Sequence, residues 1–423
     1  MAIDTLAFVM AGGRGERMMP LTEKRAKPAV PFGGHFRIID FVLSNLYNSD
    51  VRGIIVATQW KSDSLHVHLR RGWYPLFGNG PREFILTKPA VQTGSNEGWY
   101  EGTADSIIRQ KNLIKEYSLN DVMVFGGDHI YFMDVQKFHD FHAKTDAAVT
   151  ICVTRMPRKK AAGKFGVLEV DGNGRVVGFE EKPDNPKSVP GDEKNCLVSM
   201  GNYCFDTKNL LAELEHDQEK ALAQSKEEFL SDPNKFTLRD FGYNIIPSML
   251  ESKVVYAYDF SQELVPGQTK RERGYWRDVG SIDDYFNANM EIRSPDPILN
   301  LYNAEWPLYT YLPAPINPAK LVHENTRAIN SLVGINMILS DCYVRDSVLG
   351  MNGKIEEGVS IVKSILMGLN KIGRGSHINN TIIDKDVNIP SNTVIGEDKK
   401  YDKERGFTVS PGGITVVPKG YKF

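Results

Sequence analysis

The clearest hydrophobic pattern lies in the last quarter of the chain, where aliphatic residues recur at steps of six, six and five residues. The positions that follow this rule are Leu332, Ile338, Val344, Leu349, Ile355, Ile361, Leu366, Ile372, Ile378, Ile383, Ile389 and Ile395. Neither the period of a helix nor the alternation of a strand produces this spacing. A coil of three short strands per turn, with one inward side chain on each, does produce it. The pattern therefore predicts a parallel β-helix of about four turns, in which each coil stacks only on its neighbours.

Residues 1–293 show a different pattern, in which short apolar runs alternate with amphipathic stretches. The runs at 6–10, 53–58, 121–128 and 147–156 are predicted to be buried strands. This alternation predicts an α/β domain with a mostly parallel sheet. A proline-rich, aromatic segment follows, and its composition favours an extended linker packed along another surface. We therefore expect an α/β domain over 1–293, a linker over 294–325 and the β-helix over 326–423.

Glycines and cations follow the first predicted strand. The strand ends at Gly12, Gly13 and Gly15, where the backbone can turn tightly and a ligand can approach it closely. The cationic side chains that follow are Arg14, Arg17, Lys24, Arg25, Lys27 and Arg37. Backbone N–H groups beside arginine and lysine suit a polyphosphate, although an ordinary glycine turn beside a solvated basic face is the alternative. The spacing matches neither the Walker loop nor the dinucleotide fingerprint, so phosphates would be held by another scheme.

Two aspartates are candidates for a metal site. Asp128 stands at the end of the third predicted strand, after a pair of glycines, and ligands of open α/β sheets bind beyond the carboxyl ends of strands. Carboxylate oxygens there suit Mg²⁺, although Asp128 could instead cap a helix. Asp278 lies between apolar residues and a turn glycine, and it could complete a two-carboxylate site. The sequence alone does not place the two side chains side by side.

An aromatic turn precedes the third predicted strand. Trp99 and Tyr100 could stack on a nucleotide base or could anchor a loop. Thr103 is the expected N-cap of a helix that runs from Ser106 to Tyr117.

Composition narrows the class of protein. The chain has 423 residues, a formal net charge of −2 and balanced acids and bases, which disfavours nucleic-acid binding. Its 4 cysteines lack C-x-x-C spacing and are expected to be reduced thiols of a cytosolic protein. No apolar run approaches the ~20 residues of a membrane span, and the first residues lack the features of a signal peptide. We therefore expect a cytoplasmic protein that binds neither nucleic acid nor membrane.

A set of motifs distributed over nearly the whole chain resembles the sugar-nucleotide pyrophosphorylases. The motifs are Gly12-Gly-Arg-Gly-x-Arg17, Lys24-Arg-Ala-Lys-Pro-Ala-Val30, Phe32-Gly-Gly34, Arg37-Ile-Ile-Asp40, Trp99-Tyr-x-Gly-Thr-Ala-Asp105, Gly127-Asp-His-Ile-Tyr131, Glu181-Lys-Pro183, Met200-Gly-x-Tyr203, Asp240-Phe-Gly242 and Tyr275-Trp-Arg-Asp-Val-Gly280. The stretches at 24–28 and 99–105 resemble the bacterial branch that makes ADP-glucose rather than the relatives that use UTP, dTTP or GTP.

The resemblance implies a Rossmann-like nucleotidyltransferase domain followed by a left-handed parallel β-helix that serves assembly or regulation. It implies a Mg²⁺-dependent transfer of AMP from ATP to α-D-glucose 1-phosphate, which gives ADP-glucose and pyrophosphate at the first committed step of glycogen biosynthesis. It also implies a homotetramer. Two alternatives stay open, namely a sister pyrophosphorylase for another nucleotide and a non-catalytic regulatory subunit.

The resemblance also implies roles for individual residues. The catalytic residues would be Arg17, Lys27 and Asp128, and the metal ligands would be Asp128 and Asp278. ATP would contact Gly12, Gly13, Arg14, Gly15, Gln92, Trp99, Tyr100, Gly102 and Thr103. Glucose 1-phosphate would contact Tyr100, Glu181, Lys182, Ser199, Gly201, Tyr203, Asp240 and Trp276. An allosteric effector would contact Lys24, Arg25 and Arg37.

Several positions depart from the family pattern. His35 stands where the family commonly has lysine, Thr93 where an arginine is frequent, and Tyr243-Asn244 where Lys-Asp is usual. Residues 376–380 read Ser-His-Ile-Asn-Asn where relatives tend to carry arginines near their effector sites. We therefore expect activation by phosphorylated glycolytic intermediates to be weak or altered in this protein.

Overall fold

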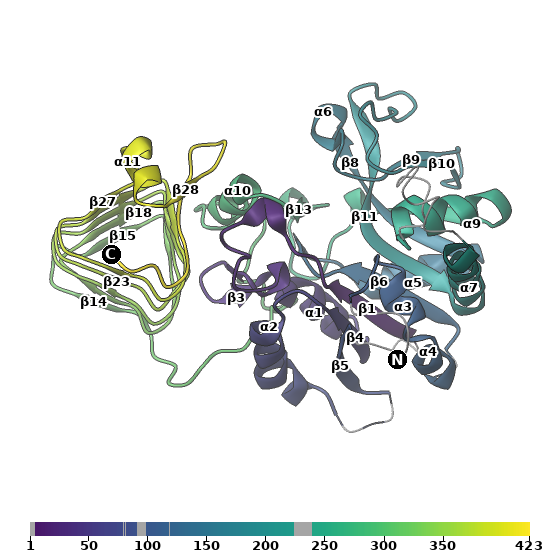
Figure 1. The fold of residues 1–423 in the computed structure, drawn as a ribbon, viewed down its shortest axis with the longest axis horizontal. Coiled ribbons are helices and arrows are strands. Elements are labelled where there is room, and N and C mark those ends of the chain that lie inside the picture. Colours follow the sequence, from purple (N-terminus) through teal and green to yellow (C-terminus); the bar gives the residue numbers. More distant parts are fainter. Residues whose placement is uncertain (1–4, 79, 81, 91–98, 118, 224–238) are drawn as a thin grey trace.

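The computed structural model describes residues 5–78, 80, 82–90, 99–117, 119–223 and 239–423. An α/β domain and a triangular β-helix lie side by side along the longest axis of the molecule (Figure 1). Gln92 and Thr93 lie outside the described residues. Within the described ranges, no helix has the length and apolar character that crossing a membrane requires.

A nine-stranded sheet forms the centre of the α/β domain, in the order β10-β9-β11-β6-β1-β4-β5, with β8 on β11 and β12 on β8. Its strands are β1 (Thr5–Ala11), β4 (Gly53–Thr58), β5 (Phe84–Pro89), β6 (Asp121–Gly126), β8 (Val149–Pro157), β9 (Val167–Val170), β10 (Val176–Glu180), β11 (Asn195–Asp206) and β12 (Val255–Asp259). Strands β6, β1, β4 and β5 are parallel to one another, whereas β11 runs antiparallel to β6, β8 and β9. The parallel half of the sheet is the part that carries the glycine loop.

Helices cover both faces of this sheet (Figure 1). The helices of the α/β domain in the described residues are α1 (Ile38–Asn48), α2 (Asp63–His68), α3 (Asp105–Ile108), α4 (Lys111–Tyr117), α5 (Val135–Thr145), α6 (Arg158–Ala161), α7 (Thr207–Ala223), α9 (Ile246–Ser252) and α10 (Ile282–Ile292), of which α10 packs against the β-helix. Strand β1 is apolar throughout because both of its faces are covered: Ala7 and Val9 belong to one hydrophobic cluster, and Leu6 and Phe8 to another.

The C-terminal part is a left-handed parallel β-helix with three flat faces. One face comprises β14 (Lys320–Val322), β17 (Ile338–Ser340), β20 (Lys354–Ile355), β23 (Lys371–Ile372) and β26 (Asn388–Ile389). The second comprises β15 (Arg327–Ile329), β18 (Tyr343–Arg345), β21 (Ser360–Val362), β24 (His377–Asn379) and β27 (Val394–Ile395). The third comprises β16 (Leu332–Val333), β19 (Val348–Leu349), β22 (Ile365–Leu366), β25 (Thr381–Ile383), β29 (Thr415–Val417) and β28 (Thr408–Val409). The short helix α11 (Lys399–Glu404) lies at the C-terminal end of the coil.

The predicted inward positions are right in the later turns and wrong at two positions of the first. Ile338 is 40% exposed, whereas its neighbour Leu339 is fully buried and lies opposite Ile355. Likewise Val333, not Leu332, lies in register with the inward residue of the next coil. Each of these strands begins with two consecutive aliphatic residues, so the sequence pattern fits either register. The structure takes the one that shortens the first coil by a residue.

The two domains share an apolar interface. Val348, Ile365 and Ile382 of the third β-helix face belong to one hydrophobic cluster with Tyr285 and Phe286 of α10. This contact gives the third face a buried exterior as well as a buried interior.

Hydrogen bonds also connect the α/β domain with the end of the β-helix and with the segment between the two domains. Asp283 of α10 accepts hydrogen bonds from Ser410 and from the Gly412 amide, in a loop near the end of the β-helix. The segment between the domains runs along α1: Trp306 Nε1 donates to Asn45 (3.2 Å), the Tyr309 amide to Ser44 (2.9 Å) and Thr310 to Asp40 (2.7 Å).

The register of the first coil gives a direct test with a matched pair of variants. Leu339→Ala should lower the free energy of unfolding by about 2–4 kcal/mol, because it empties a closely packed interior. Ile338→Ala removes a similar side chain from an exposed position and should change little. Thermal unfolding of both variants checks the register. A larger loss for Ile338→Ala would contradict the structure.

Candidate active site

A cleft of about 470 Å³ lies beyond the carboxyl ends of β1, β4 and β6. Its walls come from widely separated segments. The lining residues that carry functional groups or lie in the glycine loop are Gly12, Gly13, Gln59, Tyr100, Gly102, Thr103, Ser106, Asp128, Glu181, Lys182, Gly201, Tyr203 and Asp240 to Gly242. An adjoining hollow of about 380 Å³ is lined by Gly15, Arg17, Lys27 and Gly280 and shares Gly13 and Asp128 with the cleft. The glycine loop and Asp128 therefore lie where the two spaces meet.

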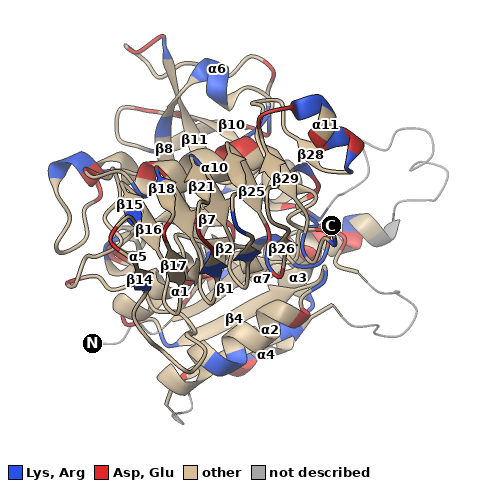
Figure 2. Ribbon diagram, turned by 90° about the vertical axis from the view of Figure 1, so that its left-hand side faces the viewer, with Lys and Arg blue, Asp and Glu red and all other residues tan. Residues whose placement is uncertain are grey.

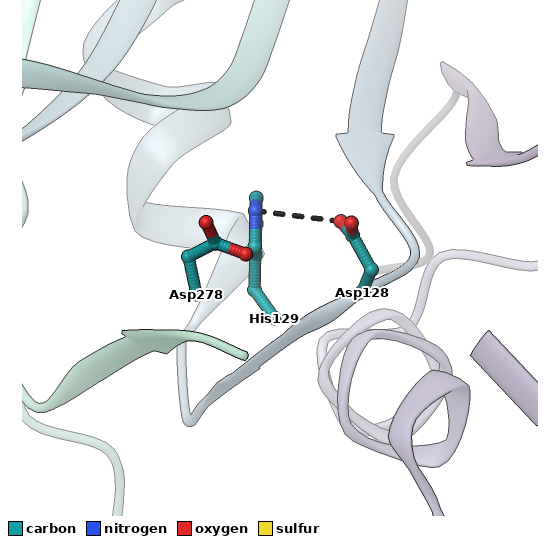
Figure 3. Close-up of side chains that lie close together, drawn as sticks. All are labelled: Asp128, His129 and Asp278. Carbon is teal, nitrogen blue, oxygen red and sulfur yellow. Dashed lines mark ion pairs between the residues drawn. The ribbon is translucent and has the colours of Figure 1, made fainter. Parts of the chain in front are cut away.

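Two strands outside the main sheet bring the predicted metal ligands together. Strand β7 (His129–Tyr131) pairs antiparallel with β13 (Trp276–Asp278), and this register sets Asp278 opposite His129. One potential ligand atom from each of Asp128, His129 and Asp278 lies within 4.8 Å of the other two. Figure 3 shows the two carboxylates on either side of the imidazole ring. Two carboxylates at this spacing suit a hard divalent cation that keeps several of its waters.

Lys27 lies between the two carboxylates. Its ammonium nitrogen is 2.7 Å from Asp128 Oδ2 and 3.1 Å from Asp278 Oδ1, and only 9% of its side chain is exposed. Burial alone would lower the pKa of Lys27, but the carboxylates of Asp128 and Asp278 raise it above its usual value. Burial raises the pKa of Asp128, but Lys27 and then His129 bring that pKa well below its usual range. Lys27 and Asp128 are therefore both charged at neutral pH.

Glycines give the charged groups room. Gly15 has φ +63°, and a Cβ there would lie 3.1 Å from Lys27 Cβ, so the loop could not pack as closely against the lysine with a larger residue. A Cβ on Gly280 would lie 2.9 Å from Asp278 Oδ2 and 3.0 Å from Arg17 Nη2. The guanidinium of Arg17 thus lies close to Asp278, on the same side of the cleft as Lys27.

The other end of the cleft carries the residues predicted for the sugar phosphate. Lys182 Nζ is 2.8 Å from Glu181 Oε1. Burial raises the pKa of Glu181, and although burial lowers the pKa of Lys182, its contacts with Glu181 raise it overall. The Ser199 hydroxyl donates to Tyr203 (3.4 Å) and accepts from the Gly201 amide (3.1 Å). Asp240 lines the same end.

Direct hydrogen bonds join the two ends of the cleft. Thr103 Oγ1 donates to Asp240 Oδ2 (2.9 Å) and accepts from the Phe241 amide (3.1 Å). The expectation that Thr103 caps a helix is wrong, because the helix is divided into α3 and α4, and residue 104 occupies the N-cap position of α3. The Thr103 side chain instead holds the loop that carries Asp240.

Sequence reasoning missed Gln59. Its side chain accepts a hydrogen bond from the Tyr100 amide (2.8 Å), and its Cβ lies 3.2 Å from the position of a Cβ on Gly12. Gln59 thus connects the glycine loop with the aromatic turn. It directly follows the last residue of β4, so the rule about strand ends that singled out Asp128 could have found it.

Four of the described residues predicted to bind ATP or the sugar phosphate line neither the cleft nor the adjoining hollow, namely Arg14, Trp99, Ser199 and Trp276. Arg14 is paired with Glu16 at the surface, and Trp99 is half exposed, with its ring centroid 6.1 Å from that of Trp60. Trp276 is buried behind His129, with ring centroids 5.0 Å apart. Their assignment to ATP or sugar stays a prediction, as does that of Gln92.

The predicted effector residues lie at the contact between the domains. Arg25 forms a buried 2.6 Å ion pair with Asp384 of the β-helix, Lys24 donates to the Lys419 carbonyl, and Arg37 donates to the Ser64 carbonyl. Burial and the neighbouring cations Arg37 and Arg25 lower the pKa of Lys385 to about 7. Elsewhere basic and acidic residues are interspersed over both domains, as Figure 2 shows.

Comparison with known families agrees with this architecture. Residues 6–294 match the nucleotidyl transferase family, and residues 317–417 match the GlmU-like C-terminal hexapeptide family. The cleft, its phosphate-suited loop and the coiled C-terminal domain therefore define a nucleotidyltransferase with a hexapeptide β-helix.

Individual relatives narrow the class further. The chain is 44% identical over 424 residues to a glucose-1-phosphate adenylyltransferase of Photobacterium profundum, covering 99% of this chain and 98% of the relative. It is 43% identical to the Aliivibrio fischeri enzyme of that name, covering 98% of each, and 41% identical to the Deinococcus radiodurans one, covering 99% of each. The chain belongs to the family of glucose-1-phosphate adenylyltransferases. The resemblance inferred from its motifs is thereby confirmed.

Removing the lysine between the carboxylates should destabilise the protein in the absence of divalent cations. Lys27→Ala leaves Asp128 and Asp278 facing each other without a cation and should cost about 2–3 kcal/mol, less than a fully buried pair because 34% of the Asp128 side chain is exposed. Thermal unfolding in a chelator measures the loss. Lys187→Ala is the matched control, since Lys187 also bridges two carboxylates, Glu169 and Glu180, but at the surface. An equal decrease of the unfolding temperature in Lys27→Ala and Lys187→Ala would contradict this interpretation of the Lys27 contacts.

Proposed function

We propose that this chain transfers AMP from ATP to α-D-glucose 1-phosphate and releases pyrophosphate, which makes ADP-glucose at the first committed step of glycogen biosynthesis. The observation that carries the proposal is the position of Lys27 and its two aspartates between a glycine loop and a second, lysine-bearing end of the cleft. Two anionic substrates could bind at those two ends and meet beside a concentrated set of charges. Membership of the glucose-1-phosphate adenylyltransferases supports the choice of substrates.

The proposed transfer of AMP does not require a general base. The attacking oxygen belongs to a phosphate that is already anionic, and it approaches the α-phosphorus in line with the departing pyrophosphate. The barrier then consists mainly of repulsion between two polyanions and of charge that grows on the leaving group. Positioned cations lower both contributions, since fixed charges in a cleft need no reorganisation during the reaction.

The proposed roles at the nucleotide end follow the geometry. The Gly12–Gly15 backbone would hold the triphosphate, and Arg17 and Lys27 would neutralise its charge. Tyr100, Gly102 and Thr103 would form the wall for the nucleoside. Arg14, Gln92 and Trp99 are proposed to complete it.

At the sugar end, the Lys182 ammonium would bind the phosphate of glucose 1-phosphate. The polar and aromatic groups that surround the sugar would come from Glu181, Ser199, Gly201, Tyr203, Asp240, Trp276 and Tyr100. The hydrogen bond between Thr103 and Asp240 would keep the nucleotide end and the sugar end of the cleft at a fixed separation.

A divalent metal is expected of a nucleotidyltransferase, and we propose that it is Mg²⁺, held by Asp128 and Asp278. The donor set fits, because both groups offer hard carboxylate oxygens within reach of one another. When bound, Mg²⁺ would supply Lewis-acid stabilisation of phosphate charge. Lys27 would then have phosphate oxygens as alternative partners.

Assembly and regulation complete the proposal. We propose a cytoplasmic homotetramer, with an effector anion beside Lys24, Arg25 and Arg37. A non-catalytic subunit is not favoured, because Arg17, Lys27 and both aspartates are present and in contact range of the cleft.

Pyrophosphate release tests the proposed function. Wild-type protein with Mg²⁺ and glucose 1-phosphate should release pyrophosphate with ATP and far less with UTP, dTTP or GTP. Asp128→Asn should lower the turnover number by about 100-fold or more, because it removes one of the two carboxylates proposed to hold Mg²⁺ at the reacting phosphates. The exposed Asp184→Asn serves as the control. Pyrophosphate release with only a nucleotide other than ATP would assign the protein the activity of a sister pyrophosphorylase. No release with any of the four nucleotides would support a non-catalytic regulatory subunit.

A further inference from the structure

Lys182 has an aromatic neighbour, Tyr243, to which the proposed function assigns no role. Its ammonium nitrogen lies 5.0 Å from the centroid of the Tyr243 ring, within the range of a cation–π contact. The Lys182 backbone has φ +49°, a conformation that a lysine seldom adopts without support from its surroundings. Tyr243 is itself 46% exposed, so its ring lies at the surface next to the lysine.

We propose that Tyr243 is a positioning residue for Lys182, which holds the ammonium group where the phosphate of the sugar substrate arrives. The inference rests on the proposed function, since it takes Lys182 as the phosphate-binding residue. Tyr243 does not line the cleft, and so it acts through the lysine rather than by touching the substrate.

The contacts of Lys182 show why a ring suits this position. An ammonium group has three N–H donors, and Glu181 accepts one of them at 2.8 Å. The ring face attracts the charge without being a conventional hydrogen-bond acceptor, so two N–H groups stay available for phosphate oxygens. A second carboxylate in place of the ring would neutralise the charge that a phosphate needs.

The backbone of the Tyr243 segment fixes where the ring lies. Asp240 Oδ1 accepts hydrogen bonds from the Gly242 amide (2.8 Å) and the Tyr243 amide (3.3 Å). A Cβ on Gly242 would lie only 2.4 Å from Glu181 Oε2, so the two loops pack directly against each other. Because Asp240 also lines the cleft, one turn places a sugar-facing carboxylate inside and the lysine's aromatic support outside.

Without the ring, the long side chain of Lys182, which is 44% exposed, gains freedom that substrate binding must remove. Tyr243→Ala should therefore raise the KM for glucose 1-phosphate by about three- to fivefold and leave the KM for ATP unchanged. Tyr243→Phe keeps the ring and should behave like the wild type. Tyr401→Ala is the matched control, because Tyr401 is also exposed and also lies under a cation, Arg405, but in the β-helix.

A double-mutant cycle distinguishes action through Lys182 from a general effect on the loop. In a Lys182→Gln background, adding Tyr243→Ala should not lower kcat/KM for glucose 1-phosphate any further. A further loss of the same size in kcat/KM would overturn the inference. So would an unchanged KM for glucose 1-phosphate in Tyr243→Ala, or an equal rise of the KM values for glucose 1-phosphate and ATP. A rise in Tyr243→Phe equal to that in Tyr243→Ala would also overturn it. Absence of turnover by the wild type would contradict the proposed function itself, whereas normal wild-type turnover with any of these results would contradict the inference alone.

Discussion

The site depends on one interaction, the contact of the Lys27 ammonium with the carboxylates of Asp128 and Asp278. Two negative groups this close would repel each other, and burial would raise the pKa of Asp128. The lysine brings the pKa of Asp128 below its usual range and holds three distant segments of the chain at one point. The glycines at 15 and 280 follow from this arrangement, since a Cβ at either position would crowd one of the charged groups or its neighbours. The same charges make the cleft suitable for phosphates and for a divalent cation.

The second aspartate also links the site with the rest of the molecule. Asp278 ends β13, and the next element, α10, carries the apolar residues that pack against the β-helix. Asp283, near the start of α10, holds the loop that contains Ser410. The C-terminal domain therefore contacts the helix that directly follows one half of the charged centre. Arg25, two residues before Lys27, makes a second link through its buried ion pair with Asp384.

Much of this could be predicted from the sequence where a pattern has a single physical solution. Spacing alone predicted the β-helix, because no other regular structure places aliphatic residues in that way. It failed at Ile338 because the adjacent Leu339 satisfies the pattern equally well, and only stacking on the next coil selects between them. The α/β class and the strand-end position of Asp128 followed from local signals in the same manner.

The features of the site that could not be predicted from the sequence depend on contacts between distant segments. The meeting of Asp128 with Asp278 requires the pairing of β7 with β13, which no local pattern encodes. The bond between Thr103 and Asp240 was missed for the same reason, because a threonine before a helix reads locally as a cap. Gln59 carried a usable signal, its place at the end of β4, but an amide side chain suggests no particular chemistry by itself.

Binding of Mn²⁺, as a spectroscopic substitute for Mg²⁺, would test most directly whether the two carboxylates form one divalent site. Titration of the protein without nucleotide, followed by electron paramagnetic resonance, would compare the wild type with Asp278→Asn and with the exposed Asp184→Asn. The account predicts that Asp278→Asn weakens Mn²⁺ binding by about tenfold or more, while Asp184→Asn leaves it unchanged. Equal affinity in all three proteins would contradict the assignment of Asp278 to the metal site.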